Sequence, residues 1–390
     1  MEEVIVVGAG IAGARVARLL AEQGKAVKLF DYRAPWEKPC GGGLTPDVFH
    51  EFADLYALRG NMKNHTMMRI VFPSGRRASI TLPEPISIIG REDLGKMLIR
   101  DAEAAGAEFI REKVMSVEYD GCWRVTAGGS EYTADLLVGA EGVNGVVRRA
   151  TAGKFDRNDL CITYSKLIPG ECPMSIVIRF FKGHEGYAWI FPRKNSTSVG
   201  LAMEGGGAKR DELVSVLTEF VNDEYRRNGL DPPDMSRPTA WLLPTIRRET
   251  FDKMRVCGDY WALVGDSAGS VDPVTGEGMF FALSTAELLA EAVKEGDLSA
   301  YEEKYREMAE VTIAKVAKVK DVFYHPRTLR LIGIGLEYSP KARKLARDLI
   351  CRYQPYDTLR RRVYKEWPRY AFEVLINSIK FKKGERRLLS

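Results

Sequence analysis

Two glycine-rich runs, far apart in the chain, have the spacing needed to bind the two ends of one long ligand. The first, Gly8-Ala-Gly-Ile-Ala-Gly13, follows the apolar run Val4–Val7, which is typical of a buried parallel strand. Gly8 allows a tight turn, Gly10 lets the backbone approach a pyrophosphate, and Gly13 lets helix and strand pack closely. We expect this run, Ala12 included, to bind a dinucleotide phosphate.

The elements around the first run fit that interpretation. A helix is expected from Ala14 to about Gln23, and its N-terminus would present backbone N–H groups and a partial positive charge to the phosphates. A second strand, Ala26–Phe30, ends at Asp31. An acid about twenty residues after the glycines is a ribose hydroxyl partner in such sites.

The second run distinguishes FAD from NAD. Trp261–Val264 is expected to be a strand that ends at Gly265-Asp266, before a glycine-rich turn and a helix over 277–292. An acid at that strand end suits a ribityl hydroxyl, and the helix N-terminus suits the anionic end of a reduced isoalloxazine. The residues expected to contact the flavin here are Asp266, Gly276, Gly278 and Met279.

With these motifs the chain resembles the FAD-dependent aromatic-hydroxylase-like flavoproteins, which include monooxygenases, flavin halogenases and geranylgeranyl reductases. Their central Gly-Ala-Asp-Gly motif is Gly139-Ala-Glu-Gly142 here, so Glu141 replaces the usual Asp and its carboxylate role departs from the family. Arg91 matches the arginine that these families place near FAD. The resemblance implies further FAD contacts at Gly41, Gly42, Arg91, Val114, Glu141 and Gly142.

Three segments resemble the geranylgeranyl reductases in particular, and among them the archaeal digeranylgeranylglycerophospholipid reductases. They are Lys38-Pro-Cys-Gly-Gly-Gly43, Tyr187-Ala-Trp-Ile-Phe-Pro192 and Asp272-Pro-Val-Thr-Gly-Glu-Gly-Met279. This resemblance implies an FAD-dependent enzyme that hydrogenates C=C bonds of geranylgeranyl chains in archaeal-type membrane ether lipids or their precursors. The electron donor stays open between ferredoxin, NAD(P)H and a quinol.

The segment Tyr187–Pro192 alternates aromatic and aliphatic side chains, as a strand with two distinct faces does. Its aromatic face would form an apolar slot for a prenyl chain, with Tyr187, Trp189, Phe191 and Pro192 as substrate-binding residues. Ordinary sheet core is the alternative, because aromatic residues are common in strands.

The chemistry of an isolated alkene suggests roles for three catalytic residues. No carbonyl is present to accept electrons, so a proton must add while reduced FAD supplies hydride. Aromatic faces at Tyr187 and Trp189 would stabilise the cationic character by roughly 0.5–2 kcal/mol each. Cys40, beside Gly41-Gly42-Gly43, is the candidate proton donor; a steric role or a small buried hydrophobe is the alternative.

Two other classes of function remain open at this point. One is an FAD-dependent monooxygenase or halogenase-like enzyme that acts on an apolar or aromatic substrate. The other is a carrier that binds flavin and prenyl lipid without reaction. A halogenase would have a Trp-x-Trp-x-Ile-Pro run, whereas position 187 is Tyr and position 191 is Phe.

The order of the motifs predicts an α/β fold with interleaved domains. Residues 1–60, 89–150 and 255–325 would form a Rossmann-like FAD-binding domain. Residues 61–88 and 151–254 would form a substrate domain built on an antiparallel sheet. Residues 326–390 are expected to be terminal helices broken at Pro340, Pro355 and Pro368.

Composition is that of a globular enzyme without a membrane span. The chain has 390 residues, 45% of them hydrophobic, and no apolar run approaches the length that a span requires. Six dispersed cysteines indicate a reducing compartment and no metal site. We expect a cytoplasmic protein that binds no nucleic acid. Basic residues gathered late in the chain leave peripheral binding to the inner face of the membrane as an open alternative.

Overall fold

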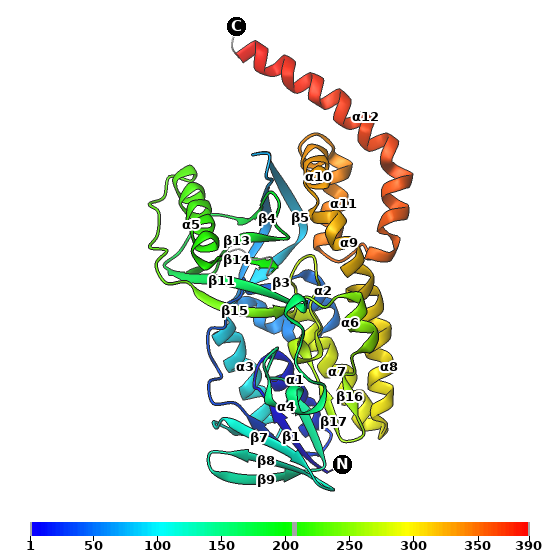
Figure 1. Ribbon diagram of the computed structural model, residues 1–390. Coiled ribbons are helices and arrows are strands. Elements are labelled where there is room, and N and C mark those ends of the chain that lie inside the picture. The colour runs from blue at the N-terminus through cyan, green and yellow to red at the C-terminus, as the bar shows by residue number, and fades with distance from the viewer. Residues whose placement is uncertain (1, 205–208, 389–390) are drawn as a thin grey trace. The chain divides into compact units, whose positions relative to one another are not determined.

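The computed structural model describes residues 2–204 and 209–388, which divide into two compact units (Figure 1). Unit 1 comprises residues 1–39, 90–162 and 241–318, and unit 2 comprises residues 40–89, 163–240 and 319–390. Each unit is assembled from three separate stretches of chain.

Unit 1 is built on a mainly parallel sheet with the order β16-β17-β10-β1-β2-β6 among its described residues. β1 pairs in parallel with β2 on one side and with β10 on the other, and β10 pairs in parallel with β17. This is the predicted Rossmann-like arrangement, and the α/β fold class is confirmed. The strands are β1 (Glu3–Val7), β2 (Ala26–Phe30), β6 (Glu108–Ile110), β10 (Leu136–Gly139), β16 (Cys257–Gly258) and β17 (Trp261–Leu263).

Helix α1 lies between α3 and α7, with which it packs, and its buried residues include Val16 and Leu20. A separate three-stranded sheet has the order β7-β8-β9, and both of its pairings are antiparallel. The helices and turns of this unit are α1 (Ile11–Glu22), α3 (Arg91–Ala104), α4 (Val146–Thr151), η2 (Arg157–Asp159), α6 (Arg248–Lys253), η3 (Gly265–Ala268), α7 (Met279–Glu295), α8 (Leu298–Ala309) and η4 (Glu310–Ala314). Its small sheet consists of β7 (Val114–Tyr119), β8 (Trp123–Ala127) and β9 (Ser130–Ala134).

The other large sheet has the order β15-β11-β14-β13-β12-β4-β5-β3 within the described residues. Its pairings are antiparallel between β12 and β13, β13 and β14, and β4 and β5, whereas β12 and β4 are parallel. The strands are β3 (Gly43–Leu44), β4 (Lys63–Val71), β5 (Arg77–Ile88), β11 (Leu160–Pro169), β12 (Ile176–Phe180), β13 (Gly186–Pro192), β14 (Ser196–Glu204) and β15 (Thr239–Pro244).

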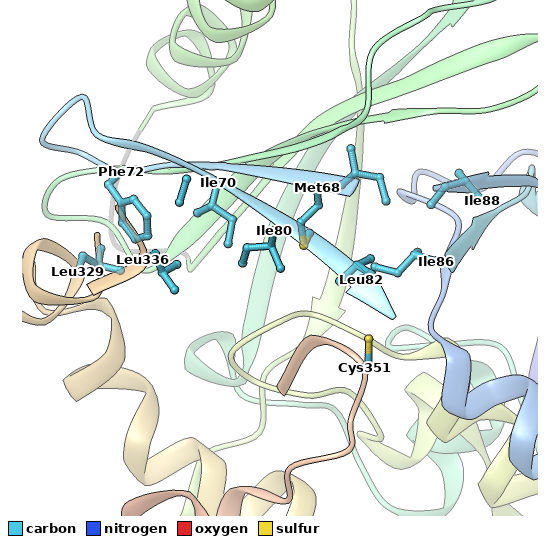
Figure 2. Close-up of a cluster of buried hydrophobic side chains, with 12 residues drawn as sticks. Met68, Ile70, Phe72, Ile80, Leu82, Ile86, Ile88, Leu329, Leu336 and Cys351 are labelled. Atoms are coloured by element: carbon cyan, nitrogen blue, oxygen red, sulfur yellow. The ribbon is translucent and has the colours of Figure 1, made fainter. Parts of the chain in front are cut away.

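One face of this sheet is covered by helices from the end of the chain. Apolar side chains of β4, β5 and β12 form a buried cluster with Leu329 and Leu336 of α10 and with Cys351 after α11 (Figure 2). The C-terminal segment is therefore part of the core of unit 2. The helices here are α2 (Pro46–Glu51), η1 (Ala53–Asn61), α5 (Arg210–Arg227), α9 (Lys315–Tyr324), α10 (Pro326–Tyr338), α11 (Pro340–Ile350) and α12 (Tyr356–Leu388).

The predicted helix break at Pro368 is wrong. Pro340 begins α11 and Pro355 lies just before α12, but Pro368 lies inside α12. A proline inside a helix removes one backbone hydrogen bond and favours a kink. Pro368 is exposed, so water can bind the carbonyl group left without an intrahelical partner, and α12 continues with a change of direction (Figure 1).

The boundaries of the two compact units differ from the predicted domain boundaries. Residues 40–60 fall in unit 2 because β3 pairs with β5 in the larger sheet. Residues 151–162 and 241–254 fall in unit 1, and residues 319–390 join unit 2. The functional meaning of the two units stays a prediction. No helix in the described part of the chain is long and apolar enough to cross a bilayer.

Candidate FAD site and reductase motifs

The first glycine run has a geometry that only glycine permits at two positions. A Cβ on Gly13 would lie 1.8 Å from the carbonyl oxygen of Gly8, so α1 packs against the turn that precedes it. Gly8 has a φ of +101°, and a Cβ there would lie 2.6 Å from the Ala140 backbone. At Gly10 the situation is opposite. It is exposed, and a Cβ would meet nothing within 4 Å, so the backbone is open to a ligand.

The helices that follow the two glycine runs both begin without a side-chain cap. The N-cap of α1 is Gly10 and that of α7 is Gly278, and neither helix has an acidic residue in its first turn. The first N–H groups of a helix need partners, and anions are favoured there. The two N-termini therefore fit the pyrophosphate and the reduced flavin that the sequence assigns to them.

Asp31 lies at the end of β2, where the ribose partner was expected. Its Oδ2 accepts a hydrogen bond of 2.9 Å from the Ala9 N–H, so the carboxylate also stabilises the glycine turn. Its Oδ1 accepts hydrogen bonds from the Arg33 and Ala34 N–H groups at 2.8 and 2.9 Å. A carboxylate has about four acceptor positions, so Asp31 can still accept from a ribose hydroxyl.

The central motif has a structural role that explains how Glu replaces Asp. Glu141 accepts hydrogen bonds of 2.9 Å from the N–H groups of Val146 and Val147, and it thus caps the start of α4. Burial raises the pKa of its carboxyl, while the two backbone N–H groups act in the opposite direction. Gly142 and Ser267 exchange two hydrogen bonds, 2.8 and 2.9 Å long, which join the central motif to the second glycine run.

The second glycine run packs directly on the first. A Cβ on Gly265 would lie 2.9 Å from the Cβ of Ala12, so both positions need a small residue. Asp266 forms an ion pair with Lys38, with 2.7 Å between Oδ2 and Nζ, and both side chains are less than one-fifth exposed. Lys38 begins the cysteine motif, so this pair connects that motif to the expected flavin contact.

The remaining predicted FAD contacts of unit 1 differ in burial, backbone conformation and hydrogen bonding. Arg91 is the first residue of α3, and its Nε is buried with no hydrogen-bond partner among the described residues, as expected of a side chain that awaits a ligand. Gly276 has a φ of +67° in the turn before α7, and Met279 is the buried first residue of that helix. Val114 is a buried residue at the start of β7, and nothing in its contacts marks it as a ligand-binding residue.

The cysteine loop of unit 2 is shaped by its glycines. A Cβ on Gly41 would lie 2.6 Å from the ring of Phe191, so this ring packs on the loop backbone. Gly42 has a φ of +78°, and a Cβ there would lie 2.1 Å from the carbonyl oxygen of Ile89. The N–H group of Gly42 points at the Cys40 sulfur, at 3.4 Å. The loop therefore has one defined conformation next to β13.

Hydrogen bonds also join the loop to the aromatic strand. Trp189 Nε1 donates to Ser198 Oγ at 3.1 Å, and Ser198 Oγ donates to the Cys40 carbonyl oxygen at 2.8 Å. Arg193 donates to the same carbonyl oxygen at 3.1 Å. The two motifs assigned to reductases are therefore one hydrogen-bonded structure, although nearly 150 residues separate them.

Tyr187, Trp189 and Phe191 lie on one face of β13, but their environments differ. Trp189 is only 5% exposed and lies over Gly200 of β14, where a Cβ would be 2.3 Å from its ring. Tyr187 and Phe191 are half-buried. Tyr187 makes edge contacts with the rings of Trp189 and Phe180, at 6.2 and 6.3 Å between centroids. We infer that Trp189 positions the loop, while Tyr187 and Phe191 are the better candidates for substrate contact.

Pro192, the last residue of β13, accepts a hydrogen bond of 2.8 Å from His65 Nε2 through its carbonyl oxygen. A carbonyl only accepts, so Nε2 carries the proton. Burial lowers the pKa of His65, against the opposing effect of this hydrogen bond. The imidazole is therefore held neutral beside the aromatic strand.

Acidification should destabilise the protein through His65. Because the pKa is lowered on folding, its contribution to the free energy of unfolding is fully present above the unfolded value of about 6.5 and is lost as the pH falls through the lower folded value. Urea midpoints at pH 7.5 and 5.5 should therefore differ more in the wild type than in His65→Gln, which donates without titrating. His50→Gln, at an exposed position, is the control. If the urea midpoint changed equally between the two pH values in wild type and in His65→Gln, the destabilisation at low pH would not come from His65.

Several residues of these sites carried no signal that sequence reasoning used. Ser198 and Arg193 lie outside any motif, and only the fold brings them to the Cys40 carbonyl. Lys38 stood within the cysteine motif without an assigned role, and Ser267 directly follows Asp266. Lys38 beside the glycines of the cysteine loop, and Ser267 beside Gly265-Asp266, were the available signals.

Known proteins are similar to this chain over most of its length. The model of the family described as FAD binding domain matches residues 1–314. A geranylgeranyl diphosphate reductase of Rhodobacter capsulatus is 26% identical over 83% of this chain and 84% of its own. A digeranylgeranylglycerophospholipid reductase of Methanocella arvoryzae is 28% identical over 82% of this chain and 86% of its own. The crystal structure of a geranylgeranyl bacteriochlorophyll reductase-like protein of Thermoplasma acidophilum superposes with a TM-score of 0.74 at 21% identity, covering 93% of this chain and 98% of that one.

The fold and the paired glycine runs define a flavoprotein of the Rossmann-like class. The chain belongs to the FAD binding domain family, and FAD is its cofactor. The open backbone at Gly10, the two uncapped helix N-termini and the buried Nε of Arg91 all fit this cofactor.

Proposed function

We propose that this protein is an FAD-dependent reductase that hydrogenates C=C bonds of geranylgeranyl chains, in archaeal-type membrane ether lipids or their precursors. The observation that carries the proposal is the hydrogen-bonded connection from Trp189 through Ser198 to the Cys40 carbonyl. It unites the two sequence motifs that separate reductases from other members of this flavoprotein class. The names of the two reductase relatives support the same substrate class.

In this proposal Cys40 donates the proton. When bound and reduced, FAD would supply the hydride that one alkene carbon needs. The Cys40 thiol would give its proton to the other carbon, so that a C=C bond becomes CH–CH. The Gly42 N–H at 3.4 Å from the sulfur would stabilise the thiolate that remains. Solvent then returns the proton to Cys40 before the next turnover.

The aromatic residues of β13 bind the prenyl chain of the substrate and limit the access of water to it. Tyr187 and Phe191 present half-buried rings on the face that carries Trp189, and Pro192 ends the same strand. A ring face near the alkene stabilises positive charge as the proton adds. FAD must be reduced again by an electron donor, for which ferredoxin, NAD(P)H and a quinol are the candidates. Peripheral attachment to the inner face of the cell membrane would give access to a lipid substrate.

Anaerobic single turnover tests the reaction. The purified protein is reduced with dithionite and mixed with a detergent-dispersed digeranylgeranyl glycerolipid, while flavin absorbance and product mass are followed. We expect reoxidation of the flavin together with a product heavier by one H₂ per reduced bond. Reoxidation that requires oxygen and yields a hydroxylated or halogenated product would support the monooxygenase or halogenase class instead. Lipid binding without reoxidation would support a carrier.

A further inference from the structure

Helix α12 has two faces with different partners. On the inner face, Tyr370 is buried, Asn377 donates to the Tyr338 carbonyl oxygen at 2.7 Å, and Arg362 pairs with Asp348 at 2.8 Å. These residues attach α12 to α10 and α11, with which it packs. The position of the opposite face is therefore defined by the fold of unit 2.

The outer face of α12 carries large apolar side chains that face solvent. Their exposed fractions are 86% for Tyr364, 55% for Trp367, 63% for Phe372 and 60% for Leu375. They follow one another at intervals of three, five and three residues, and Tyr364 and Leu375 are about three helical turns apart, so all four lie on one side. Folded proteins rarely expose several large apolar side chains next to one another, and such a patch marks an interaction site.

Basic residues accompany this apolar face. Arg360, Arg361, Lys365 and Arg369 are exposed on the same helix, and none has an ion pair with an acidic side chain of the described chain. The nearby Glu366 and Glu373 are instead engaged with Tyr370 and with the start of α11. The sequence beyond adds the basic residues Lys380, Lys382, Lys383, Arg386 and Arg387. The outer face therefore combines aromatic side chains with positive charge.

We propose that this outer face, defined by Tyr364, Trp367, Phe372 and Leu375 with their four basic neighbours, docks the protein on an anionic lipid bilayer. A helix with Trp, Phe and Leu on one side and Lys or Arg beside them lies in the membrane interface, where its apolar side enters the headgroup region. Long basic side chains reach the lipid phosphates from the flanks. No crossing of the bilayer is involved.

An anionic bilayer fits this face better than an acidic protein does. Trp and Tyr are enriched at the membrane–water interface, whereas Lys is depleted from protein–protein interfaces. The positive charge complements the negative cytoplasmic leaflet. The inference goes beyond the proposed reaction, since it concerns a surface that contains none of the residues assigned to FAD or to the alkene.

Vesicle sedimentation of the full chain tests the proposal. Vesicles of phosphatidylglycerol and phosphatidylcholine are compared with vesicles of phosphatidylcholine alone, at low and high salt. We expect binding to the anionic vesicles that weakens as salt is raised, because the Debye length shortens. Equal binding to both kinds of vesicle, or none to either, would overturn the proposal.

Matched variants locate the surface. The charge variant Arg360→Gln/Arg361→Gln/Lys365→Gln/Arg369→Gln should bind anionic vesicles about six hundredfold more weakly, since each of the four basic residues near the surface contributes about fivefold. The variant Trp367→Ser/Phe372→Ser should bind at least about tenfold more weakly. The control Lys209→Gln/Arg210→Gln/Arg226→Gln/Arg227→Gln removes the same charge from exposed positions at the two ends of α5. Circular dichroism and FAD content verify that each variant is folded.

Three results would contradict the assignment to a bilayer. The first is a loss of vesicle binding in the α5 control as large as the loss in the α12 charge variant. Loss of a dimer in the α12 variants, seen by analytical ultracentrifugation, would instead assign the face to a second copy of the chain. Salt-sensitive retention by an acidic electron-transfer protein, with no vesicle binding, would assign it to a protein partner. Single turnover with detergent-dispersed lipid should be unchanged in the α12 variants, so failure here leaves the proposed reaction intact.

Discussion

Replacing Gly10 by valine should leave a folded protein that has lost FAD. Gly10 is exposed, has no strained backbone angle, and a Cβ there would meet nothing within 4 Å in the protein. The added side chain would instead occupy the space in which the backbone of α1 approaches the pyrophosphate. We expect the Kd for FAD to rise about a hundredfold or more, equivalent to roughly 3 kcal/mol, as measured by flavin fluorescence titration of the apoprotein.

Two further glycine variants separate binding from folding. Gly60→Val is the matched control, because its Cβ would also meet nothing within 4 Å, and it should retain FAD. Gly13→Val should lose FAD and also lower the urea midpoint of the apoprotein, since its Cβ would lie 1.8 Å from the Gly8 carbonyl oxygen. Wild-type affinity in Gly10→Val would show that the phosphate does not bind at this helix.

Cys40→Ala should bind FAD and lipid normally but reoxidise reduced flavin far more slowly. General acid catalysis by a positioned group contributes typically about 10²–10⁴-fold, and we expect a loss in that range in anaerobic single turnover. The loop should keep its conformation, because the Cys40 carbonyl group, not its side chain, accepts from Ser198 and Arg193. The removed atom is the sulfur to which Gly42 donates.

The variants Cys40→Ser and Cys122→Ala complete this test. Serine keeps the size and a hydroxyl group but is a much weaker acid, so Cys40→Ser should be nearly as slow as Cys40→Ala. Cys122 is partly exposed between β7 and β8 in unit 1, and its replacement should change nothing. A Cys40→Ala protein with the wild-type rate would remove the cysteine from the proton transfer, and Tyr187 would become the next candidate.

The FAD-binding elements could be predicted because their information is local. The strand, glycines, helix and second strand of residues 3–30 appear in the structure within two or three residues of their predicted bounds. A tight turn, a close helix–strand contact and an open phosphate position each require glycine whatever surrounds them. The same holds for β13, whose two-residue alternation places Tyr187, Trp189 and Phe191 on one face.

The roles of individual side chains were harder to predict from the sequence than the secondary-structure elements. That Trp189 contacts substrate stays a prediction, and the structure adds that its ring lies over Gly200 and that its Nε1 donates to Ser198. Strand alternation assigns a face but does not reveal what the neighbouring strand presents there. Lys38 and Asp266 likewise meet only because two loops, 228 residues apart, are folded together.

The sequence by itself determined the parallel sheet, the cofactor class and the strand that carries the aromatic face, since glycine spacing and side-chain periodicity act over a few residues. Only the tertiary structure decided that α10 and α11 complete the core of the larger sheet, that α12 continues through Pro368, and that the Cys40 loop is held by Ser198. Each of these depends on contacts between segments far apart in the chain. Their free energy comes from packing and hydrogen bonds that no local pattern records.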